Sequence, residues 1–378
     1  MNVLLIGGTG VLSSAVAAEA LRKGIEVTMI NRGNRVVPMG VEHIKADKDD
    51  KKAIGKALEG RVFDAVIDFL CYSKEETEQS LVFYSHFTNQ YFFISSCAVY
   101  NTKLLNGQMG DESSPKGIPV WRYSVDKCAS EEAIVSISKK LGIHYTIIRP
   151  AITYDDTRIP YGIAPLYGYH WTLCARILSG KPIIQWNGGV NRCNMMRVED
   201  FAVGVIGLLG NPLAYDEAFN ICGDEAPSWN EVLQALAEAL GKEVKTVDIS
   251  PLFYADCLPS RYGEIIGGRA IDAFNSNQKI KKIVPGFIQK ISLKEGVART
   301  VTAYKEHNYQ HGIDWRFDAD TDRIIKKWCK KNHLRTNRYN LHFTNYLGTA
   351  SIKDRLLYYY TLHKESIIIH SINRIRKA

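Results

Sequence analysis

Tyr123 and Lys127 are the two residues whose types and spacing first suggest chemistry. They stand four positions apart near the start of an expected helix over 124–141, so their side chains lie on one face. A lysine ammonium beside a phenol favours the phenolate, and such a tyrosine can exchange a proton with a carbinol or carbonyl oxygen. Ser96 ends an expected strand, where its hydroxyl can bond the same oxygen. We therefore expect Ser96, Tyr123 and Lys127 to form a catalytic set that assists the transfer of a hydride.

A glycine-rich turn, Gly-Gly-Thr-Gly at residues 7–10, separates the first expected strand from the first expected helix. Glycine allows a tight turn and a close approach of the backbone to a pyrophosphate, and the start of a helix presents free N–H groups to the anion. Ser13 takes the third small position and is small enough for the helix to pack on the strand. The turn predicts a dinucleotide site, in which Lys127 can also hold the nicotinamide ribose. The expected cofactor contacts are Gly7, Thr9, Gly10, Val11, Leu12, Asn31, Arg32, Arg35, Asp47, Phe69, Leu70, Lys127, Pro150 and Ile152.

The end of the second expected strand reads Ile-Asn-Arg-Gly-Asn-Arg at residues 30–35, without a carboxylate. NAD sites usually carry Asp or Glu there, which accepts from the ribose hydroxyls. A guanidinium suits a 2′-phosphate instead, so Arg32 and Arg35 favour NADP(H). NAD(H) stays open, because both arginines can also be ordinary exposed loop residues. Asp47 can accept from the adenine amino group or cap the helix that follows it.

Alternating strands and helices organise the first part of the chain. A short apolar run bounded by glycine indicates a buried strand, and strand–helix alternation implies a doubly wound parallel sheet of the Rossmann type. Strands are expected at 2–6, 25–30, 62–70, 91–96 and 144–148, and helices at 11–23, 50–59, 74–87 and 124–141. This α/β pattern predicts a dinucleotide-binding domain over residues 1–150.

The pattern changes after Arg149-Pro150, where Gly, Pro, Tyr and Trp become frequent. We expect residues 151–325 to form a smaller substrate lobe interwoven with the first domain. Asp200 is expected to cap a helix that begins there. The elements expected in the lobe are helices near 168–179, 200–210, 228–240, 293–307 and 319–332, and strands at 182–186 and 195–198.

A basic helical extension is expected over residues 326–378. It carries 12 Lys/Arg and 2 Asp/Glu, a net charge of +10, whereas the whole chain is +8 and residues 1–325 are therefore −2. Apolar side chains at helical spacing favour packing on the body or on a partner subunit over contact with an anionic membrane surface, and nucleic-acid binding is the less favoured alternative. These apolar residues are Leu356, Leu357, Tyr360, Ile367, Ile368, Ile372 and Ile375.

The composition excludes several classes of protein. Of the 378 residues, 46% are apolar and 23% are charged, which is globular rather than disordered. No apolar run approaches the roughly 18 residues of a spanning helix, and we recognise no signal peptide. The eight cysteines are scattered without a zinc or disulfide pattern, so we expect no metal and a reducing, cytoplasmic location.

Together these motifs resemble the extended short-chain dehydrogenase/reductase superfamily, of the nucleotide-sugar epimerase/dehydratase type. The resemblance spans residues 1–325 and rests on the turn at 7–13, Asn31-Arg32-Gly33, Ile-Ser-Ser-Cys-Ala-Val-Tyr at 94–100, Tyr123 with Lys127, Ile148-Arg149-Pro150, Gly180-Lys181-Pro182, Arg192-Cys193-Asn194, Val198-Glu199-Asp200 and Phe219-Asn220-Ile221. It implies that Ser96, Tyr123 and Lys127 are catalytic. It also implies that residues after Pro150 and within 165–195 contact a nucleotide sugar. Many relatives form dimers through helices that correspond to 74–87 and 124–141, so a homodimer is expected.

The expected substrate contacts combine the catalytic residues with polar residues of the lobe. Arg192 is the first choice for the phosphates, because a partly buried arginine needs an anion. Each arginine can instead form an ordinary salt bridge. The full expected set is Ser96, Tyr123, Tyr154, Arg158, His170, Arg192 and Arg261.

The resemblance leaves the reaction to be chosen. Sugar-nucleotide 4,6-dehydratases place an Asp-Glu pair just after the serine position, where this chain has Cys97-Ala98, which argues against elimination. Cys97 and His170 could act as further acid or base groups, although a small buried cysteine and a packed histidine are favoured. A simple epimerase usually keeps NAD, whereas a net reductase commonly draws on NADPH. Arg32 therefore favours reduction of a keto group on a nucleotide-linked sugar, in the synthesis of surface-polysaccharide precursors, with an epimerase and a catalytically lapsed RNA-binding relative as alternatives.

Overall fold

Residues 1–165, 169–307, 312–341 and 350–365 are described by the computed structural model. The chain forms two compact units, the first comprising 1–154, 192–226 and 267–292, and the second 155–191, 227–266 and 293–378. Parts of the predicted lobe therefore belong to the first unit. They do so because residues 217–221 add a strand to its sheet, a strand that the sequence did not predict.

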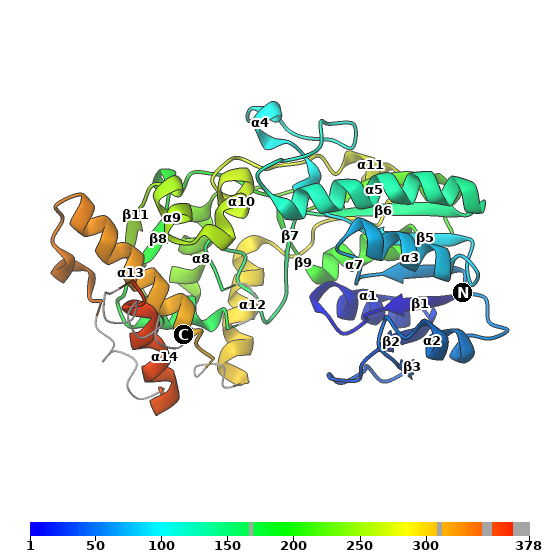
Figure 1. The fold of residues 1–378 in the computed structure, drawn as a ribbon, viewed down its shortest axis with the longest axis horizontal. Coiled ribbons are helices and arrows are strands. Elements are labelled where there is room, and N and C mark those ends of the chain that lie inside the picture. The colour runs from blue at the N-terminus through cyan, green and yellow to red at the C-terminus, as the bar shows by residue number, and fades with distance from the viewer. Residues whose placement is uncertain (166–168, 308–311, 342–349, 366–378) are drawn as a thin grey trace, which may run out of the picture. The chain divides into compact units, whose positions relative to one another are not determined.

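A parallel sheet of seven strands organises the first unit, in the order β10-β6-β5-β4-β1-β2-β3 (Figure 1). The direction of winding reverses beside β1, and ligands of such folds bind at the carboxyl ends of the strands near that point. The predicted doubly wound α/β fold is confirmed. The strands are β1 (Asn2–Ile6), β2 (Glu26–Asn31), β3 (Val41–Lys45), β4 (Ala65–Asp68), β5 (Gln90–Ile94), β6 (His144–Pro150) and β10 (Glu217–Ile221).

Helices cover both faces of this sheet. On one face α1 (Val11–Arg22) packs with α7 (Val198–Gly207), and on the other α3 (Lys74–Tyr84) packs with α5 (Arg122–Leu141). The continuous apolar run of β1 serves both faces, since Val3 and Leu5 enter one core while Leu4 and Ile6 enter the other.

Smaller elements complete the first unit. They are α2 (Lys51–Ala57), α4 (Thr102–Leu105), α11 (Gln278–Ile283) and a parallel pair of β7 (Ile152–Tyr154) with β9 (Met195–Arg197). The predicted capping role of Asp200 is wrong, because α7 begins at Val198 with Arg197 as its N-cap. The carboxylate of Asp200 instead accepts the backbone N–H groups of Lys290 at 2.9 Å and Ile291 at 3.0 Å.

The second unit is mainly helical. Its parallel strand pair joins β8 (Ile183–Gln185) to β11 (Thr246–Asp248). The extension predicted from residue 326 begins inside α13. The helices are α6 (Trp171–Leu178), α8 (Trp229–Leu240), α9 (Pro251–Cys257), α10 (Tyr262–Glu264), α12 (Leu293–Glu306), α13 (Trp315–Lys331) and α14 (Ile352–Leu362).

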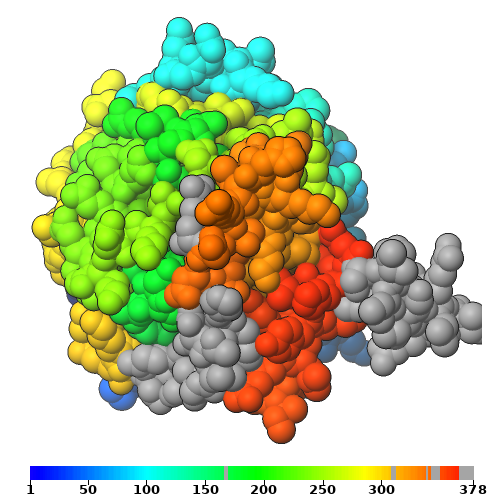
Figure 2. All heavy atoms as spheres, turned by 90° about the vertical axis from the view of Figure 1, so that its left-hand side faces the viewer, coloured from blue at the N-terminus to red at the C-terminus, as the bar shows by residue number. Residues whose placement is uncertain are grey.

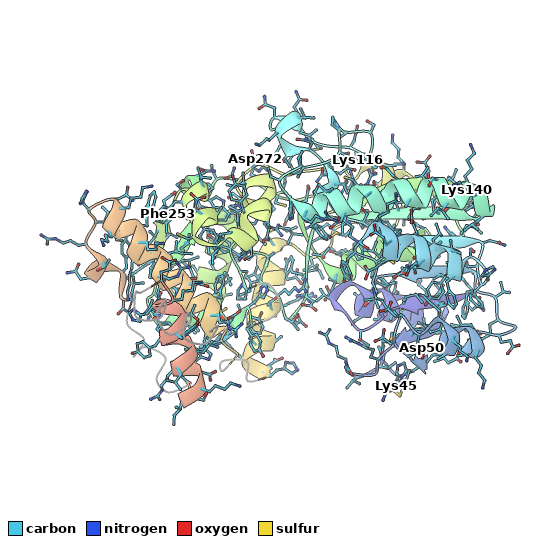
Figure 3. All side chains as sticks on the ribbon, in the orientation of Figure 1. Lys45, Asp50, Lys116, Lys140, Phe253 and Asp272 are labelled. Carbon is cyan, nitrogen blue, oxygen red and sulfur yellow. The ribbon has the colours of Figure 1, made fainter. Side chains whose placement is uncertain are left out.

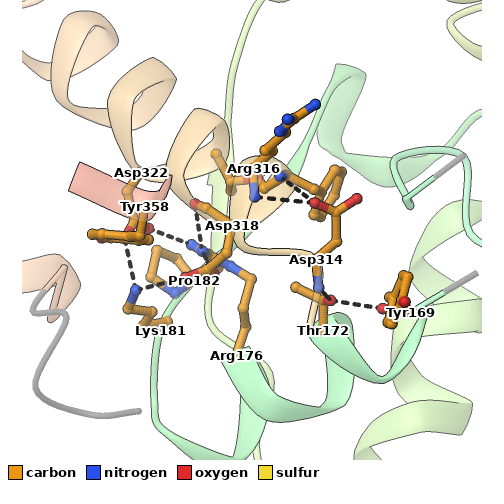
Figure 4. Close-up of polar contacts among 12 residues, drawn as sticks. Tyr169, Thr172, Arg176, Lys181, Pro182, Asp314, Arg316, Asp318, Asp322 and Tyr358 are labelled. Carbon is orange, nitrogen blue, oxygen red and sulfur yellow. Dashed lines mark hydrogen bonds and ion pairs between the residues drawn. The ribbon is translucent and has the colours of Figure 1, made fainter. Parts of the chain in front are cut away.

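A fully buried ionic cluster joins α6, α13 and α14 in the second unit (Figure 4). Arg176 pairs with both Asp318 and Asp322, and Lys181 lies 3.3 Å from Asp318 and 2.6 Å from Asp322. The Tyr358 hydroxyl donates to Asp322 at 2.6 Å. Two cations thus face two carboxylates, which offsets the cost of removing these charges from water.

This cluster shows how the C-terminal extension packs. Packing is the predicted outcome, but of the predicted apolar residues in the described part of the chain only Leu357 is partly buried. Leu356 and Tyr360 are exposed, whereas Tyr358 and Thr361 face inward. The helix is held by polar contacts, which a pattern of apolar residues does not reveal. Ile367, Ile368, Ile372 and Ile375 lie outside the described residues.

Candidate active site

The glycine turn between β1 and α1 requires glycine at residue 7. Gly7 has φ +91°, and a Cβ atom there would lie 2.6 Å from Cγ of Leu70. The N–H of Gly7 donates to the carbonyl of Ile30 at 2.9 Å, which holds the turn against the end of β2. Val11 and Leu12, both expected cofactor contacts, begin α1 directly after the turn. The structure therefore brings the turn, the end of β2 and Leu70 together.

Ser13 braces this turn. Its Oγ accepts the N–H of Gly10 at 2.8 Å and donates to the carbonyl of Gly7 at 3.0 Å. We expected only a small side chain here, but the serine also satisfies two backbone groups of a buried turn.

The end of β2 is cationic and has its own hydrogen bonds. The carbonyl oxygen of the Asn31 side chain accepts the Gly33 N–H at 2.7 Å and lies 3.1 Å from Nε2 of His43, whereas its buried Nδ2 has no hydrogen-bond partner. Nη1 of Arg35 donates to the Thr9 carbonyl at 2.8 Å, so this guanidinium lies against the glycine turn. Arg32 is exposed beside them. The site thus offers amide and guanidinium donors where an NAD site usually has a carboxylate acceptor.

Asp47 follows β3, near this end of the sheet. Its side chain accepts the backbone N–H of Asp49 at 3.1 Å. The alternative in which Asp47 caps the next helix is wrong, because Asp50 is the N-cap of α2 and accepts the Ala53 N–H at 3.0 Å (Figure 3). The carboxylate of Asp47 stays a candidate for the adenine amino group.

Lys127 is buried on α5 and reaches the ends of two central strands. Its Nζ donates to the carbonyls of Cys71 and Ile94, both at 2.8 Å. The aromatic rings of Tyr72 and Phe93 lie 5.2 Å and 4.8 Å from the ammonium. Burial lowers the pKa of Lys127 to about 8, because the charged form has lost water.

Tyr123 lies one helical turn before Lys127, with its ring centroid 6.0 Å from the ammonium, and 37% of the residue is exposed. Desolvation raises the pKa of Tyr123, while a side-chain hydrogen bond with Ser96 and the charge of Arg269 act to lower it. The net pKa is above the ordinary value of tyrosine, so this phenol is protonated. The expectation that Lys127 produces a phenolate is therefore not met in this structure.

Ser96 stands where β5 ends and a short 3-10 turn begins. Its Oγ accepts the Ala98 N–H at 3.1 Å, and this hydroxyl acts to lower the pKa of Tyr123. The predicted set of Ser96, Tyr123 and Lys127 is thus brought together. Cys97 is the next residue, and its thiol donates to the carbonyl of Arg149. Desolvation raises the pKa of this thiol, which argues against a role as acid or base, although Cys97 is only partly buried.

A buried polar network supports the strand ends around the site. Arg149 makes two hydrogen bonds to Glu131, at 2.8 Å and 2.7 Å, and another to the Tyr100 hydroxyl at 2.8 Å. Tyr100 donates to Oδ1 of Asn220 at 2.6 Å, and Ser95 donates to Glu131 at 2.7 Å. Motifs that the sequence showed only as separate segments therefore meet in one network. Their role is to hold β5, β6, β10 and α5 together.

Arg269 is a candidate that sequence reasoning missed. It follows Gly267 and Gly268, where a Cβ atom would lie 2.8 Å from Ile118 and 2.9 Å from Trp121. The glycine pair lets this backbone pack against the segment that leads into α5. The positive charge of Arg269 acts to lower the pKa of Tyr123. Two adjacent glycines before an arginine were the available signal.

The expected substrate residues are divided between the units. In the first unit Tyr154 is buried, with the guanidinium of Arg197 at 5.7 Å from its ring. Arg192 is exposed rather than partly buried, and its Nε donates to the Ala226 carbonyl at 2.8 Å. The strand ends also place Phe69, Pro150 and Ile152 in the first unit, after β4, in β6 and in β7.

Arg158, His170 and Arg261 belong to the second unit. Arg261 is buried, pairs with Glu264 at 3.0 Å and donates to the Ala164 carbonyl at 3.0 Å. Nδ1 of His170 accepts the Ile159 N–H at 3.0 Å, and burial lowers the pKa of this histidine to about 4. A neutral, backbone-bonded imidazole fits the packed-histidine alternative.

The lowered pKa of Lys127 predicts a pH dependence of stability. Between about pH 8 and the ordinary lysine value of 10.5, the unfolded chain binds the proton that the folded protein has lost. The unfolding free energy of the wild type should therefore rise with pH, relative to Lys127→Met, by about 3 kcal/mol in total over that interval. Urea denaturation of both proteins from pH 7 to 11 measures this difference. Parallel curves would show that Lys127 does not titrate there.

Comparison with known proteins places the chain in a family. The sequence profile of the family described as "NAD dependent epimerase/dehydratase family" matches residues 3–222. The chain is 25% identical to the chloroplast stem-loop binding protein of 41 kDa b of Arabidopsis thaliana, over 64% of this chain and 63% of that protein. It is 20% identical to the 2′-dehydrokanamycin reductase of Streptomyces kanamyceticus, over 68% of this chain and 72% of that protein. It is 27% identical to the UDP-arabinose 4-epimerase 1 of Arabidopsis thaliana, over 82% of this chain and 81% of that protein. The match with the stem-loop binding protein thus spans less than two thirds of that relative.

The fold also matches solved structures. The UDP-glucose 4-epimerase of Thermotoga maritima with UDP-glucose superposes with a TM-score of 0.65 at 18% identity, covering 82% of this chain and 100% of that one. Among the described helices, none has both the length and the apolar content needed to cross a membrane.

The family profile covers more than half of the chain and includes the glycine turn, Ser96, Tyr123 and Lys127. The chain therefore belongs to the NAD dependent epimerase/dehydratase family and is an NAD(P)-dependent enzyme.

Proposed function

We propose that this enzyme uses NADP(H) to reduce a keto group on a nucleotide-linked sugar. The observation that carries the proposal is the end of β2, where Asn31, Arg32 and Arg35 replace a carboxylate and Arg35 lies against the glycine turn. Two guanidinium groups suit the 2′-phosphate that distinguishes NADP(H) from NAD(H). An enzyme that draws reducing equivalents from NADPH in the cell performs net reduction.

The residues of the chain divide the work of this reaction. The glycine turn and the start of α1 receive the pyrophosphate, and Arg32 and Arg35 receive the 2′-phosphate. A reduced nicotinamide held there would supply the hydride chemistry. Ser96 donates a hydrogen bond to the carbonyl oxygen, and Tyr123 releases its hydroxyl proton to that oxygen as the C=O double bond becomes a C–O single bond. A tyrosine that is protonated before reaction suits this direction.

An epimerase is the second candidate, and the comparisons support it. A curated relative and a solved structure are named as 4-epimerases of UDP-sugars. The same three residues would then assist a bound dinucleotide in oxidising and re-reducing one carbon, without net change of the cofactor. RNA binding, suggested by the stem-loop binding relative, is less favoured because the catalytic residues are retained.

Cofactor selectivity tests the proposal. We would release any bound dinucleotide from the purified protein and titrate NADPH and NADH onto the emptied protein. NADPH should bind at least about tenfold more tightly, as a paired 2′-phosphate allows. Arg32→Ala with Arg35→Ala should remove this preference and leave NADH affinity unchanged. Arg22→Ala is the control, because Arg22 is exposed at the far end of α1. Tightly retained NAD that epimerises a nucleotide sugar without net turnover would establish the second candidate instead.

A further inference from the structure

The helix α14 turns the hydroxyl-bearing Tyr358 and Thr361 inward and an apolar stripe outward. A helix on a protein surface ordinarily buries its apolar stripe. Here Ile352 and Leu356 are 78% and 67% exposed, and Tyr359 and Tyr360 are about half exposed. These four residues follow i, i+4, i+7 and i+8 spacing and form one stripe, which we call the α14 stripe.

Polar contacts fix the orientation of this helix. Tyr358 donates to Asp322 on its inner side, and directly after the helix Lys364 donates to Asp320 at 2.7 Å. Glu365 pairs with Arg323 and lies 2.6 Å from Lys327. Rotation of α14 to bury its stripe would break these contacts. The fold therefore holds the apolar stripe outward.

The segment of the chain that carries the stripe is strongly positive. Residues 326–365 contain nine Lys/Arg and two Asp/Glu, a net charge of +7. Lys353 lies within α14, and Lys330, Lys331 and Arg335 are exposed on or after α13. Figure 2 shows α13 and α14 side by side on one face of the second unit, consistent with their packing. Both acidic residues are engaged, Glu365 with cations and Asp354 with the hydroxyl of Ser351.

We propose that the α14 stripe, with the lysines around it, docks the second unit on an anionic lipid surface. Aliphatic side chains enter the acyl boundary, tyrosines rest at the headgroups, and lysines pair with lipid phosphates. A second copy of the chain fits less well, since two faces of the same positive charge would meet. RNA fits less well too, because the most exposed side chains, Ile352 and Leu356, cannot stack on bases. This surface is independent of the proposed reaction.

Vesicle flotation of the full chain tests the proposal. We would use vesicles of phosphatidylcholine alone and vesicles in which about a quarter of the lipid is phosphatidylglycerol. The protein should float with the anionic vesicles only. Ile352→Gln with Leu356→Gln should weaken binding by about tenfold or more, and Lys353→Glu by about fivefold or more.

Matched controls separate this surface from general effects. Leu213 is 67% exposed, like Leu356, but belongs to the first unit, so Leu213→Gln should bind as the wild type does. Lys103→Glu is the corresponding control for charge, because Lys103 is exposed on α4. Thermal unfolding of each variant checks that it is folded, and NADPH titration checks the first unit separately.

Three results would overturn the proposal. The first is absence of the wild type from the anionic vesicles, and the second is equal binding to both kinds of vesicle. The third is a dimer in light scattering that Leu356→Gln dissociates without an effect of lipid, which would assign the stripe to a second copy. None of these results bears on cofactor selectivity, so failure here and failure of the proposed function are distinguishable.

Discussion

Replacing Tyr123 with phenylalanine is expected to lower the turnover of a keto-sugar nucleotide by about a thousandfold, the middle of the range for a general acid. The variant loses only the hydroxyl that donates the proton, and the ring still fills its place beside Ser96 and Lys127. Affinity for NADPH should change by less than about twofold, because the hydroxyl acts on the substrate rather than on the cofactor. Stopped-flow absorbance of NADPH measures the single-turnover rate.

The control for this variant is Tyr215→Phe, since Tyr215 stacks on His144 at the surface, with ring centroids 4.3 Å apart. It should retain the wild-type rate. Ser96→Ala should lower the rate less than Tyr123→Phe, because it removes a hydrogen bond but not the proton donor. If the Tyr123→Phe protein turns over its substrate at a rate within tenfold of that of the wild type, Tyr123 is not the general acid, and another residue must supply the proton.

Replacing Arg149 with methionine is expected to reduce the unfolding free energy by about 3–5 kcal/mol at pH 7, because it removes the buried cation that makes two hydrogen bonds to a buried carboxylate. Glu131 is almost fully buried and keeps only Ser95 and Lys116 as partners in the variant. Burial acts to raise the pKa of Glu131, but hydrogen bonding to Arg149 and its charge hold that pKa below the ordinary value of 4.5.

The sign of the pH effect follows from that lowered pKa. In the wild type, the contribution of the pair is complete above the unfolded-state pKa and is lost as pH falls through the lower folded-state value. In Arg149→Met the pKa of Glu131 should rise, so the deficit of the variant should shrink between pH 7 and pH 4.5. Urea denaturation at these two values measures both effects.

Two further variants make this result specific. Arg149→Met with Glu131→Leu should be more stable than Arg149→Met alone, since the buried carboxylate is then removed as well. Arg122→Met removes an exposed arginine that pairs with Asp126 and should cost less than about 1 kcal/mol. If the double variant is no more stable than the single one, the loss arises from packing and not from the buried carboxylate.

Local features of the sequence determined most of the fold of the first unit and pointed to the proposed catalytic residues. Short apolar runs predict strands, a glycine turn predicts a phosphate site, and a four-residue spacing places Tyr123 and Lys127 on one helix face. These inferences hold because each depends on neighbours along the chain. Strand β10 was missed for the opposite reason, since it joins the sheet only after the chain has left and returned. Strand β3 was missed too, because it lies at the edge of the sheet and none of its residues is fully buried.

The tertiary structure alone decided the protonation of the site. The sequence suggested that Lys127 favours the phenolate form of Tyr123, whereas desolvation raises the pKa of Tyr123 and lowers that of Lys127. Desolvation depends on what distant segments pack around a group, and residue spacing carries no information about it. Tertiary packing also lets the charge of Arg269 act to lower the pKa of Tyr123, although more than 140 positions separate the two residues in the chain.

In the C-terminal extension, too, the sequence determined some features and the tertiary structure decided others. Its composition determined that it would be helical and basic, and apolar spacing correctly suggested that it would pack. Which face turns inward was decided by Asp322, Arg323 and Lys327 on α13, whose charges fix α14 by its polar side. A helix buries the face that its neighbour can satisfy, and that neighbour is known only once the chain has folded.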